Sequence, residues 1–225
     1  STPQFVGIHH PLPAQPSQDE LPHWQKKPKR KWGLIGFPIE HSQSPHTHRD
    51  LNADIAYYRL PIQTKSELEH ALNTLPQWSI RGLSVTTPWK TTACSHTDTL
   101  CDTSKAAQAL NTLVYHTGGW HGFNTDGPAT LALVKHINPP ARVLILGGGG
   151  YARAVAASLH DAGYTVTFCL RSPEKYRGTH AVISWDERLR FKADIIIQGT
   201  TLGSHRHDPL PVTGAMVQQG PLTLN

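Results

Sequence analysis

The chain has 225 residues, of which 38% are hydrophobic and 16% charged, a balance typical of globular rather than disordered proteins. This length accommodates two modest domains or one large one. The formal net charge of +5 suits small anionic ligands. The apolar runs are too short to span a bilayer, and the first residues show no secretory signal.

Three groups of residues bear on partners and location. The three cysteines are sparse and none lies in a C-x-x-C pair, which predicts reduced thiols in a cytoplasmic protein. The histidines at 46–48 and 205–207 lack zinc-site spacing, so no metal site is expected. The basic run at 25–32 is more typical of a solvated linker than of a nucleic-acid interface. We therefore expect neither nucleic-acid nor membrane partners.

The first half of the chain predicts an alternating series of strands and helices. Residues 1–30 are rich in Pro, Gln and His and are expected to form an arm or linker. Expected strands lie at 32–38, 55–62 and 80–88, helices at 44–54, 66–76 and 101–110, and a hairpin with Gly118-Gly119 at its tip at 111–124. Ser44 and Ser66 are the expected helix N-caps, with Pro45 at the first helical position. This alternation predicts an α/β unit.

The second half predicts a separate nucleotide-binding unit. A connecting helix at 125–138 is followed by a strand at 142–146, a glycine turn, an alanine-rich helix, a strand ending near 170 and a strand at 193–200. The expected fold is α/β, with an N-terminal α/β substrate domain and a C-terminal Rossmann-like domain. The expected boundaries are 1–30 for the arm, 31–127 for the substrate domain and 128–225 for the dinucleotide domain.

The glycine turn is the clearest cofactor signal. The segment has Gly147-x-Gly149-x-x-Ala152, which joins a buried strand to a helix and leads to a second strand about twenty residues on. Gly147 permits backbone angles that a side chain forbids, Gly149 and Gly150 let a pyrophosphate approach backbone N–H groups, and Ala152 keeps helix and strand close. The phosphates are expected on the positive end of the helix dipole, at a turn that also includes Tyr151.

The end of the following strand indicates which dinucleotide is bound. NAD sites usually place Asp or Glu there to accept from the ribose 2′-hydroxyl. Here the strand ends in Leu170-Arg171-Ser172, and the first carboxylate is Glu174. Arg171 offers a forked cation to a 2′-phosphate, Ser172 can donate, and Lys175 adds charge. These residues favour NADP.

Polar residues gather at strand ends and turns of the first half. They are Ser42, Ser44, Thr86, Lys90, Asn111, Asn124 and Asp126. Ligands of open α/β sheets bind outside the carboxyl ends of the strands, so these residues are expected to form a substrate site.

The ordered motifs resemble the shikimate dehydrogenase family. They are GFPIEHSQSP, VTTPWK, ALNTL, GFNTDG, LILGGGGYARA and LRS, and the resemblance covers roughly residues 32–203. It implies NADP-dependent reduction of 3-dehydroshikimate to shikimate and the reverse oxidation, within chorismate and aromatic amino acid biosynthesis. Two alternatives stay open: a quinate/shikimate dehydrogenase using NAD(P), and a non-catalytic sensor of these metabolites.

The resemblance also implies residue roles. Ser42 and Ser44 match the hydroxyls that hold the substrate carboxylate, Thr86 matches a substrate contact, and Asn111 matches the asparagine that binds ring hydroxyls. Lys90 matches the catalytic lysine and Asp126 its acidic partner. A ketone carbon that accepts a hydride leaves an alkoxide, which an ammonium can both stabilise and protonate. A nearby carboxylate would keep that lysine charged.

Several positions depart from the family pattern. Ser84 stands where the family usually has Asn, Gln108 stands where it has Gly, and Leu170 replaces the Asn of its N-R-T motif. The chain ends within about twenty residues of its TTLG turn, so the C-terminal domain is expected to be incomplete relative to the family. The N-terminal arm is similar to the junction of fused dehydroquinate dehydratase–shikimate dehydrogenase chains, so a fused or adjacent dehydratase is a further expectation.

Overall fold

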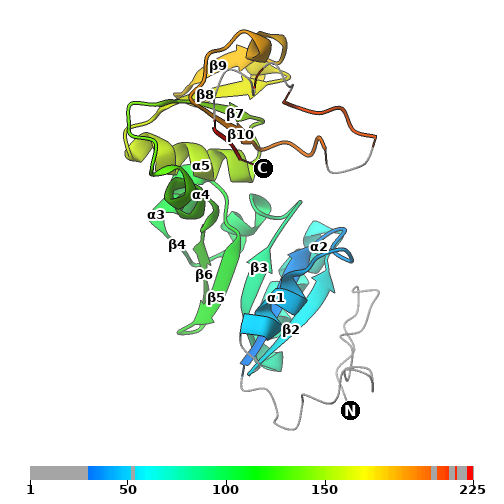
Figure 1. The fold of residues 1–225 in the computed structure, drawn as a ribbon. Helices are drawn as coiled ribbons and strands as arrows, with labels where there is room; N and C mark the ends of the chain where they lie inside the picture. The colour runs from blue at the N-terminus through cyan, green and yellow to red at the C-terminus, as the bar shows by residue number, and fades with distance from the viewer. Residues whose placement is uncertain (1–29, 52–53, 204–206, 213–215, 217–221, 225) are drawn as a thin grey trace. The chain divides into compact units, whose positions relative to one another are not determined.

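The computed structural model describes residues 30–51, 54–203, 207–212, 216 and 222–224. The expected arm therefore lies almost entirely outside the described residues. The chain separates into two compact units (Figure 1). Unit 1 comprises the described residues up to Ser104 together with Leu110–Phe123, and unit 2 comprises Lys105–Ala109 together with the described residues from Asn124 onward.

Unit 1 is built on a six-stranded sheet in the order β2-β1-β3-β5-β6-β4. Its strands are β1 (Arg30–Gly36), β2 (Ile55–Pro61), β3 (Ile80–Val85), β4 (Thr99–Leu100), β5 (Thr112–His116) and β6 (Gly119–Phe123). Its helices are α1 (Ser44–Leu51), α2 (Lys65–Thr74) and the first half of α3 (Asp102–Ala107), with 3₁₀ turns at Leu75–Trp78 and Thr92–His96. Strands β1, β2 and β3 are parallel, whereas β5 runs antiparallel to β3 and β6. The parallel strands therefore end at the same edge as the start of β5.

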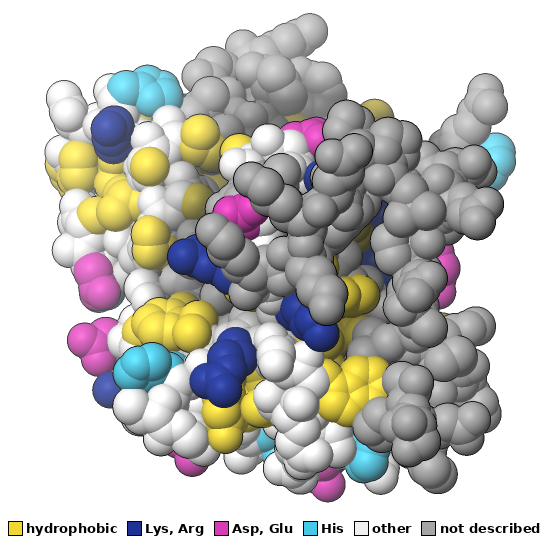
Figure 2. Space-filling model, turned by 90° about the horizontal axis from the view of Figure 1, so that it is seen from below, with side chains coloured by type: hydrophobic (Ala, Val, Ile, Leu, Met, Phe, Trp, Pro, Cys, Tyr) yellow, Lys and Arg dark blue, Asp and Glu magenta, His cyan; other side chains and the backbone are white. Residues whose placement is uncertain are grey.

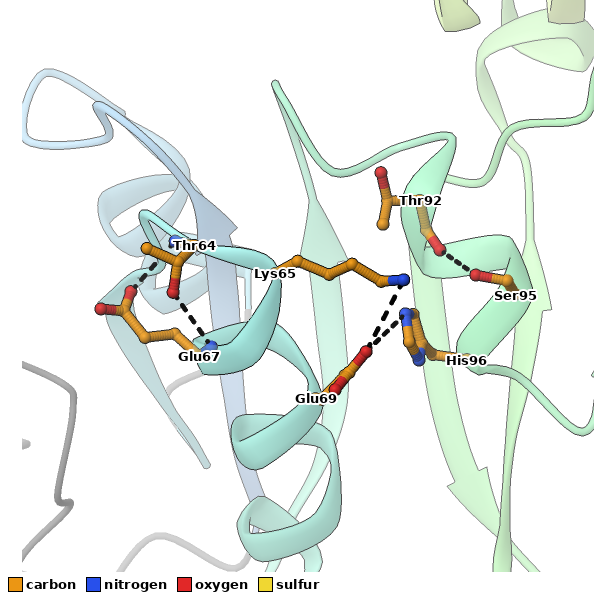
Figure 3. A network of polar contacts seen from close by, with 7 residues as sticks. All are labelled: Thr64, Lys65, Glu67, Glu69, Thr92, Ser95 and His96. Carbon is orange, nitrogen blue, oxygen red and sulfur yellow. Dashed lines mark hydrogen bonds and ion pairs between the residues drawn. The ribbon is translucent and has the colours of Figure 1, made fainter.

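Helix α2 begins at a different cap from the expected one. The Thr64 hydroxyl accepts from the Glu67 backbone N–H at 3.2 Å, and the Glu67 carboxylate accepts from the Thr64 N–H at 3.3 Å (Figure 3). This reciprocal capping box replaces the expected cap at Ser66. The helix then buries Leu68, Ala71 and Leu72 against the sheet, in the core of unit 1. The hydrophobic face of α2 thus agrees with the sequence, and its start lies two residues earlier.

A small charged network joins α2 to the 3₁₀ turn that follows Lys90. Figure 3 shows Lys65 and His96 both directed at the Glu69 carboxylate. The Lys65 Nζ lies 3.8 Å and the His96 Nε2 3.7 Å from Glu69 Oε1. Glu69 is about half exposed, and ion pairs at such positions contribute only about 0–1 kcal/mol. Buried apolar packing between these elements, not this network, therefore holds the turn in place.

The hairpin β5–β6 confirms the expected pairing but moves its tip by one residue. His116 pairs with Gly119, so Thr117 and Gly118 form the connection. Both have positive φ, 50° and 86°, as two-residue hairpin turns of the I′ type require. The expected Gly118-Gly119 tip is therefore wrong by one position, because Gly119 already belongs to β6.

Gln108 adopts a left-handed backbone conformation with φ of 49°. This explains why the family pattern has glycine at this place. Left-handed geometry costs a side-chain-bearing residue about 1–2 kcal/mol, while glycine loses about 0.5–1 kcal/mol more backbone freedom on folding. The strain is local, because the turn still forms its bond from the Gln108 N–H to the Lys105 carbonyl at 3.2 Å.

The first prediction follows from this strain. Gln108→Gly should raise the free energy of unfolding by about 0.5–1 kcal/mol, since it relieves more strain than it adds in entropy. Urea unfolding followed by circular dichroism measures the change. Gln77→Gly is the matched control, because Gln77 lies in a 3₁₀ turn without positive φ, and this change should lower stability. A loss of stability in both variants would contradict the strain at Gln108.

Unit 2 has a parallel five-stranded sheet in the order β11-β10-β7-β8-β9. Its strands are β7 (Arg142–Leu146), β8 (Thr165–Leu170), β9 (Ala181–Ser184), β10 (Ile195–Gln198) and β11 (Leu222–Leu224), and its helices are α4 (Asp126–Val134) and α5 (Gly150–Asp161). Strand β7 is central, with β8 on one side and β10 on the other. The order of the strands reverses at β7, which is where open α/β sheets bind ligands.

The core of unit 2 explains why its strands read as continuous apolar runs. Val143, Ile145, Phe168, Ile195 and Ile197 are almost fully buried and pack with the inner face of α5. Leu144, Leu146 and Ile196 are buried on the other face of the sheet. Parallel sheets are buried on both faces, so alternation is absent from their strands. The α/β class and the Rossmann-like character of this half are confirmed.

The described residues bear on membrane binding, metal binding and surface charge. No helix in the described ranges is both long and apolar enough to cross a bilayer. No described group of three or more His, Cys, Asp or Glu side chains is arranged to hold a metal ion. On the face drawn in Figure 2, Lys and Arg side chains lie among hydrophobic and uncharged ones, with the carboxylates dispersed.

Candidate active site

Ser42 and Ser44 lie where β1 passes into α1. The Ser42 hydroxyl donates to the Ser44 hydroxyl at 3.1 Å and accepts from the Ser44 backbone N–H at 3.3 Å. The first backbone bond of α1 runs from the Thr47 N–H to the Gln43 carbonyl. Gln43 is therefore the N-cap residue of α1, one position before the expected cap Ser44. The Ser44 side chain is not needed as the cap. We call Ser42–Ser44 the S-x-S segment.

An aromatic and hydroxyl cluster lies against the S-x-S segment. The Tyr57 hydroxyl donates to the Ser84 hydroxyl at 2.7 Å and forms a further hydrogen bond with Ser44. The His48 ring stacks on the Tyr57 ring at 4.2 Å between centroids. Burial raises the pKa of the Tyr57 phenol, which the hydrogen bonds to Ser84 and Ser44 partly offset. Tyr57 therefore stays a neutral hydroxyl that links β2 to β3 and to α1.

Thr86 follows the end of β3 and is held against the end of β1. Its backbone N–H donates to the Ile35 carbonyl at 2.9 Å, and the Phe37 N–H donates to the Thr87 carbonyl at 2.9 Å. A side chain at Gly36 would clash with the Thr86 methyl group. Glycine is therefore required at 36 for the two strand ends to approach this closely.

Lys90 is fixed by the residue before it and by the segment opposite. The Trp89 indole is buried and donates to the Ile62 carbonyl at 2.8 Å, while the Trp89 backbone N–H donates to the Thr86 carbonyl at 2.9 Å. The Lys90 carbonyl accepts from the Leu110 N–H at 2.8 Å. Its side chain is half-buried. The buried Trp89 thus anchors the turn that carries Lys90.

Asn111 lies at the start of β5, beside the end of β3. Its carbonyl accepts from the Val85 N–H at 2.7 Å, and its N–H donates to the Phe123 carbonyl at 3.0 Å. The Thr112 hydroxyl donates to the Asn111 side-chain oxygen at 3.0 Å. Unit 1 therefore brings the ends of β1 and β3 and the start of β5 to one edge of its sheet. Ser42, Ser44, Thr86, Lys90 and Asn111 lie on the segments at that edge.

Asp126 belongs to unit 2, where it opens α4. Its backbone N–H donates to the Asn124 side-chain oxygen at 3.0 Å, and the buried Asn124 amide donates to the Ala109 carbonyl at 3.0 Å. Asn124 therefore acts as a structural anchor for the start of the helix. Lys90 and Asp126 lie in different units, so their expected pairing stays a prediction.

The glycine turn borders a cavity of about 280 Å³ in unit 2. The lining residues come from the carboxyl ends of β7, β8, β9 and β10: Gly147, Gly148, Gly149, Cys169, Leu170, Arg171, Trp185, Gly199, Thr200, Thr201 and Leu202. Gly147 has φ of 99°, and a Cβ there would lie 2.9 Å from the Gly199 carbonyl oxygen. A Cβ at Gly149 would meet nothing within 4 Å, so the turn is open on that side. Helix α5 begins at Gly150 and directs its N-terminal N–H groups toward the turn.

Two helix residues named as cofactor contacts have clear packing roles. Ala152 is fully buried, and a Cβ added at Gly199 would lie 3.2 Å from the Cβ of Ala152. The Tyr151 hydroxyl lies 3.3 Å from the Thr130 hydroxyl of α4, and its ring packs against the core of unit 2. The Tyr151 side chain thus joins α4 to α5, which leaves its backbone N–H as the group near the turn.

The expected 2′-phosphate residues divide between two neighbouring cavities. Arg171 lines the cavity beside the glycine turn. Ser172 and Lys175 line a second cavity of about 570 Å³, which shares Gly148 and Leu170 with the first and also includes Arg153. The end of β8 therefore presents both a hydroxyl and cations to ligands near the turn, and no carboxylate lines either cavity among the described residues.

Sequence reasoning missed two residues near the S-x-S segment, Tyr57 and Arg59. Both lie on β2, two positions apart and hence on the same face of the strand. The Arg59 Nη2 donates to the Ser42 carbonyl at 2.6 Å. Their spacing along β2 places them on one face, but no motif indicated which face meets the site.

Comparison with known proteins finds similarity in both sequence and structure. Residues 34–113 match the family model described as the shikimate dehydrogenase substrate binding domain. A shikimate dehydrogenase (NADP(+)) from Acidiphilium cryptum (strain JF-5) is 36% identical over 204 residues, which cover 84% of this chain and 73% of that protein. A chorismate mutase/shikimate 5-dehydrogenase fusion protein from Clostridium acetobutylicum has a similar structure, with a TM-score of 0.77, 26% identity and coverage of 86% of this chain and 84% of that one.

A further structure shares the fold at lower identity. Shikimate 5-dehydrogenase from Thermus thermophilus, solved in complex with NADP(H) and shikimate, has a TM-score of 0.73 and 23% identity, with coverage of 87% of this chain and 86% of that one.

Proposed function

Because this chain belongs to the shikimate dehydrogenase family, we propose that it catalyses the reversible NADP-dependent reduction of 3-dehydroshikimate to shikimate. The observation that carries the proposal is the convergence of the two serines, Thr86, Lys90 and Asn111 on one edge of the unit 1 sheet. Relatives in this family are NADP-dependent oxidoreductases by name. The residue roles below rest on matched positions together with that geometry.

Binding is assigned to the polar groups around the strand ends. The hydroxyls of the S-x-S segment hold the substrate carboxylate, Thr86 contacts the substrate, and Asn111 binds the ring hydroxyls. Asn111 can do this because its side-chain oxygen already accepts from Thr112, which orients the amide. The geometry supports these roles, since Arg59 of β2 bonds to the S-x-S segment and backbone bonds tie Thr86 to β1 and Asn111 to β3.

Proton transfer is assigned to Lys90. In reduction its ammonium donates a proton to the oxygen of the ketone being reduced, and in oxidation the neutral amine accepts the proton from the hydroxyl. Asp126 is its proposed acidic partner, which would orient the side chain and favour its charged form. The buried Trp89 and its bond to the Ile62 carbonyl anchor the backbone of this turn.

The residues of unit 2 fit a dinucleotide phosphate. The space beside Gly149 is open, the helix N-terminus faces it, and Arg171, Ser172 and Lys175 lie at the neighbouring strand end. NADPH supplies the hydride when bound. The chain's contribution is to hold the pyrophosphate on the N–H groups of the glycine turn and to meet the 2′-phosphate with Arg171.

A spectrophotometric assay tests the proposal. When 3-dehydroshikimate is added to the purified chain and NADPH, the NADPH absorbance at 340 nm should fall. The expected kcat is on the order of 1–10³ s⁻¹. Parallel reactions use shikimate and quinate with NADP⁺ or NAD⁺, and calorimetry measures binding of each. Turnover of quinate with NAD⁺ would point to the quinate alternative. Binding of shikimate without any turnover would point to the sensor and refute the catalytic proposal.

We further propose a cytoplasmic location and a dehydroquinate dehydratase as a fused or adjacent partner. Cys94, Cys101 and Cys169 all lie in the described part of the chain and are thiols. Burial raises the pKa of Cys169 to about 11, so this thiol stays protonated at neutral pH.

The Clostridium relative is fused to a chorismate mutase, so a fused chain has a precedent in this fold. Mass spectrometry of the endogenous protein tests the fusion.

A further inference from the structure

Arg59 is a cation in direct contact with the backbone of the S-x-S segment. It lies on β2, the strand beside which α1 packs (Figure 1). Its Nη2 donates to the Ser42 carbonyl at 2.6 Å. Its side chain is half-buried, and its Nε is buried without a hydrogen-bond partner in the described structure. The guanidinium is thus held in place by one bond while part of it stays unsatisfied.

An unsatisfied buried N–H on a charged group is unfavourable unless something else compensates the charge. The groups found around the S-x-S segment do not compensate it. They are the hydroxyls of Ser42, Ser44, Tyr57 and Ser84, which are neutral, and the His48 ring, which stacks on Tyr57. Burial lowers the pKa of His48, which favours its neutral form. Arg59 is therefore the charged group that contacts this segment directly in the described structure.

These observations indicate an anion subsite with a charge behind it. Hydroxyls alone bind carboxylates and neutral polar groups with similar preference, because they can donate to either. A guanidinium hydrogen-bonded to the backbone of the same segment adds an attraction that only an anion experiences, and partial burial reduces screening by salt. The single bond to Ser42 also sets the distance between the charge and the segment.

We propose that Arg59 is a specificity-determining residue that gives the S-x-S segment its selectivity for a carboxylate over a neutral substituent of the same shape. This rests on the proposed function, which assigns the substrate carboxylate to Ser42 and Ser44. It extends that assignment by naming the source of positive charge. Arg59 acts through space and through the Ser42 carbonyl, so it is a positioning residue and not a catalytic one.

A purely structural role for Arg59 would have a different signature. If the arginine only supported the S-x-S segment through its bond to Ser42, its loss would weaken every ligand of the segment equally. If it supplies charge, its loss weakens anions alone. The ratio of affinities for shikimate and for its primary amide, a neutral ligand of nearly the same shape, separates the two roles.

The experiment measures both affinities by calorimetry for wild type, Arg59→Gln and Arg59→Lys. Arg59→Gln should reduce the preference for the acid over the amide by about tenfold, equivalent to one lost charge-assisted interaction, with little change for the amide. Arg59→Lys should keep most of the preference, because it keeps the charge. In steady-state assays, Arg59→Gln should raise KM and leave kcat within about threefold.

Arg81→Gln is the matched control, since Arg81 is an exposed arginine of β3 in the same unit and its loss changes the net charge equally. It should leave the preference unchanged, and thermal unfolding should show that all variants fold. An unchanged preference in Arg59→Gln would overturn the proposal, as would equal loss of both ligands or a wild type without preference for the acid. A wild type that prefers the acid but shows no turnover would refute the proposed function. The affinity ratios of the Arg59 variants would still decide the role of Arg59.

Discussion

Lys90→Met should lower kcat by about 10²–10⁴-fold in both directions while changing KM little, because it removes the proposed proton donor and acceptor. Methionine keeps a similar length and leaves the neighbouring Trp89 and its bond to Ile62 intact. Steady-state rates with 3-dehydroshikimate and NADPH, and with shikimate and NADP⁺, give the result. Calorimetry with shikimate should show an affinity close to that of wild type.

Lys65→Met is the matched control for the loss of a lysine from unit 1. Lys65 is mostly exposed and pairs only weakly with Glu69, so its replacement should leave kcat unchanged. Near-wild-type turnover of Lys90→Met would show that the proton passes through another group. A large rise in KM at unchanged kcat would make Lys90 a binding residue instead.

Arg171→Ala should lower kcat/KM for NADPH by about 10²-fold while changing kcat/KM for NADH little, because the forked cation meets only the 2′-phosphate. The position supports this, since Arg171 lines the cavity at the glycine turn. Initial rates with each cofactor at saturating 3-dehydroshikimate measure the preference.

Arg190→Ala controls for charge, because Arg190 is exposed in the same unit and lines neither cavity beside the glycine turn. It should not alter the cofactor preference. Equal losses with NADPH and NADH in Arg171→Ala would place the arginine on a part common to both cofactors, such as the pyrophosphate or the adenine. No loss with either would remove Arg171 from the cofactor site.

The arrangement of strands and helices could be predicted where local signals are strong. The buried runs at β1, β3, β7 and β10 and the turn at Gly147 each combine apolar residues with glycine or proline at a boundary. The cap of α2 could not be decided in this way. Thr64–Glu67 and Ser66–Glu69 have the same spacing, and both match a capping box. Packing of the helix on the sheet selects between them, and that is a tertiary effect.

The short strands were missed for a related reason. Strands β4, β9 and β11 have two, four and three residues, so their extended conformation depends on a neighbouring strand more than on their own sequence. Position Gln108 is an instructive case. The family pattern identified it as a departure, but only the backbone showed that the residue retains the left-handed angle that glycine would take freely.

The candidate site shows the same division. Residues in turns with proline and glycine around them, such as Lys90, could be found from motifs. Tyr57 and Arg59 could not, since each lies within a strand that carries no motif to mark a site. Their significance depends on which face of β2 meets α1 and on the hydrogen bonds to Ser84 and Ser42. Such contacts between distant segments become visible only in three dimensions.

The chain passes between the two units at three places, since Lys105–Ala109 belongs to unit 2 although unit 1 residues flank it on both sides. Ala107 and Ala109 pack on Ala154, and the carbonyls of this short segment accept from Arg153 and Asn124. A genetic exchange with a single breakpoint after Phe123 would therefore deliver a dinucleotide unit that lacks part of its own interior. Recombination should accordingly pass on the two units together, because a chimaera that exchanges one unit intact requires breakpoints at all three crossings, near residues 105, 110 and 124.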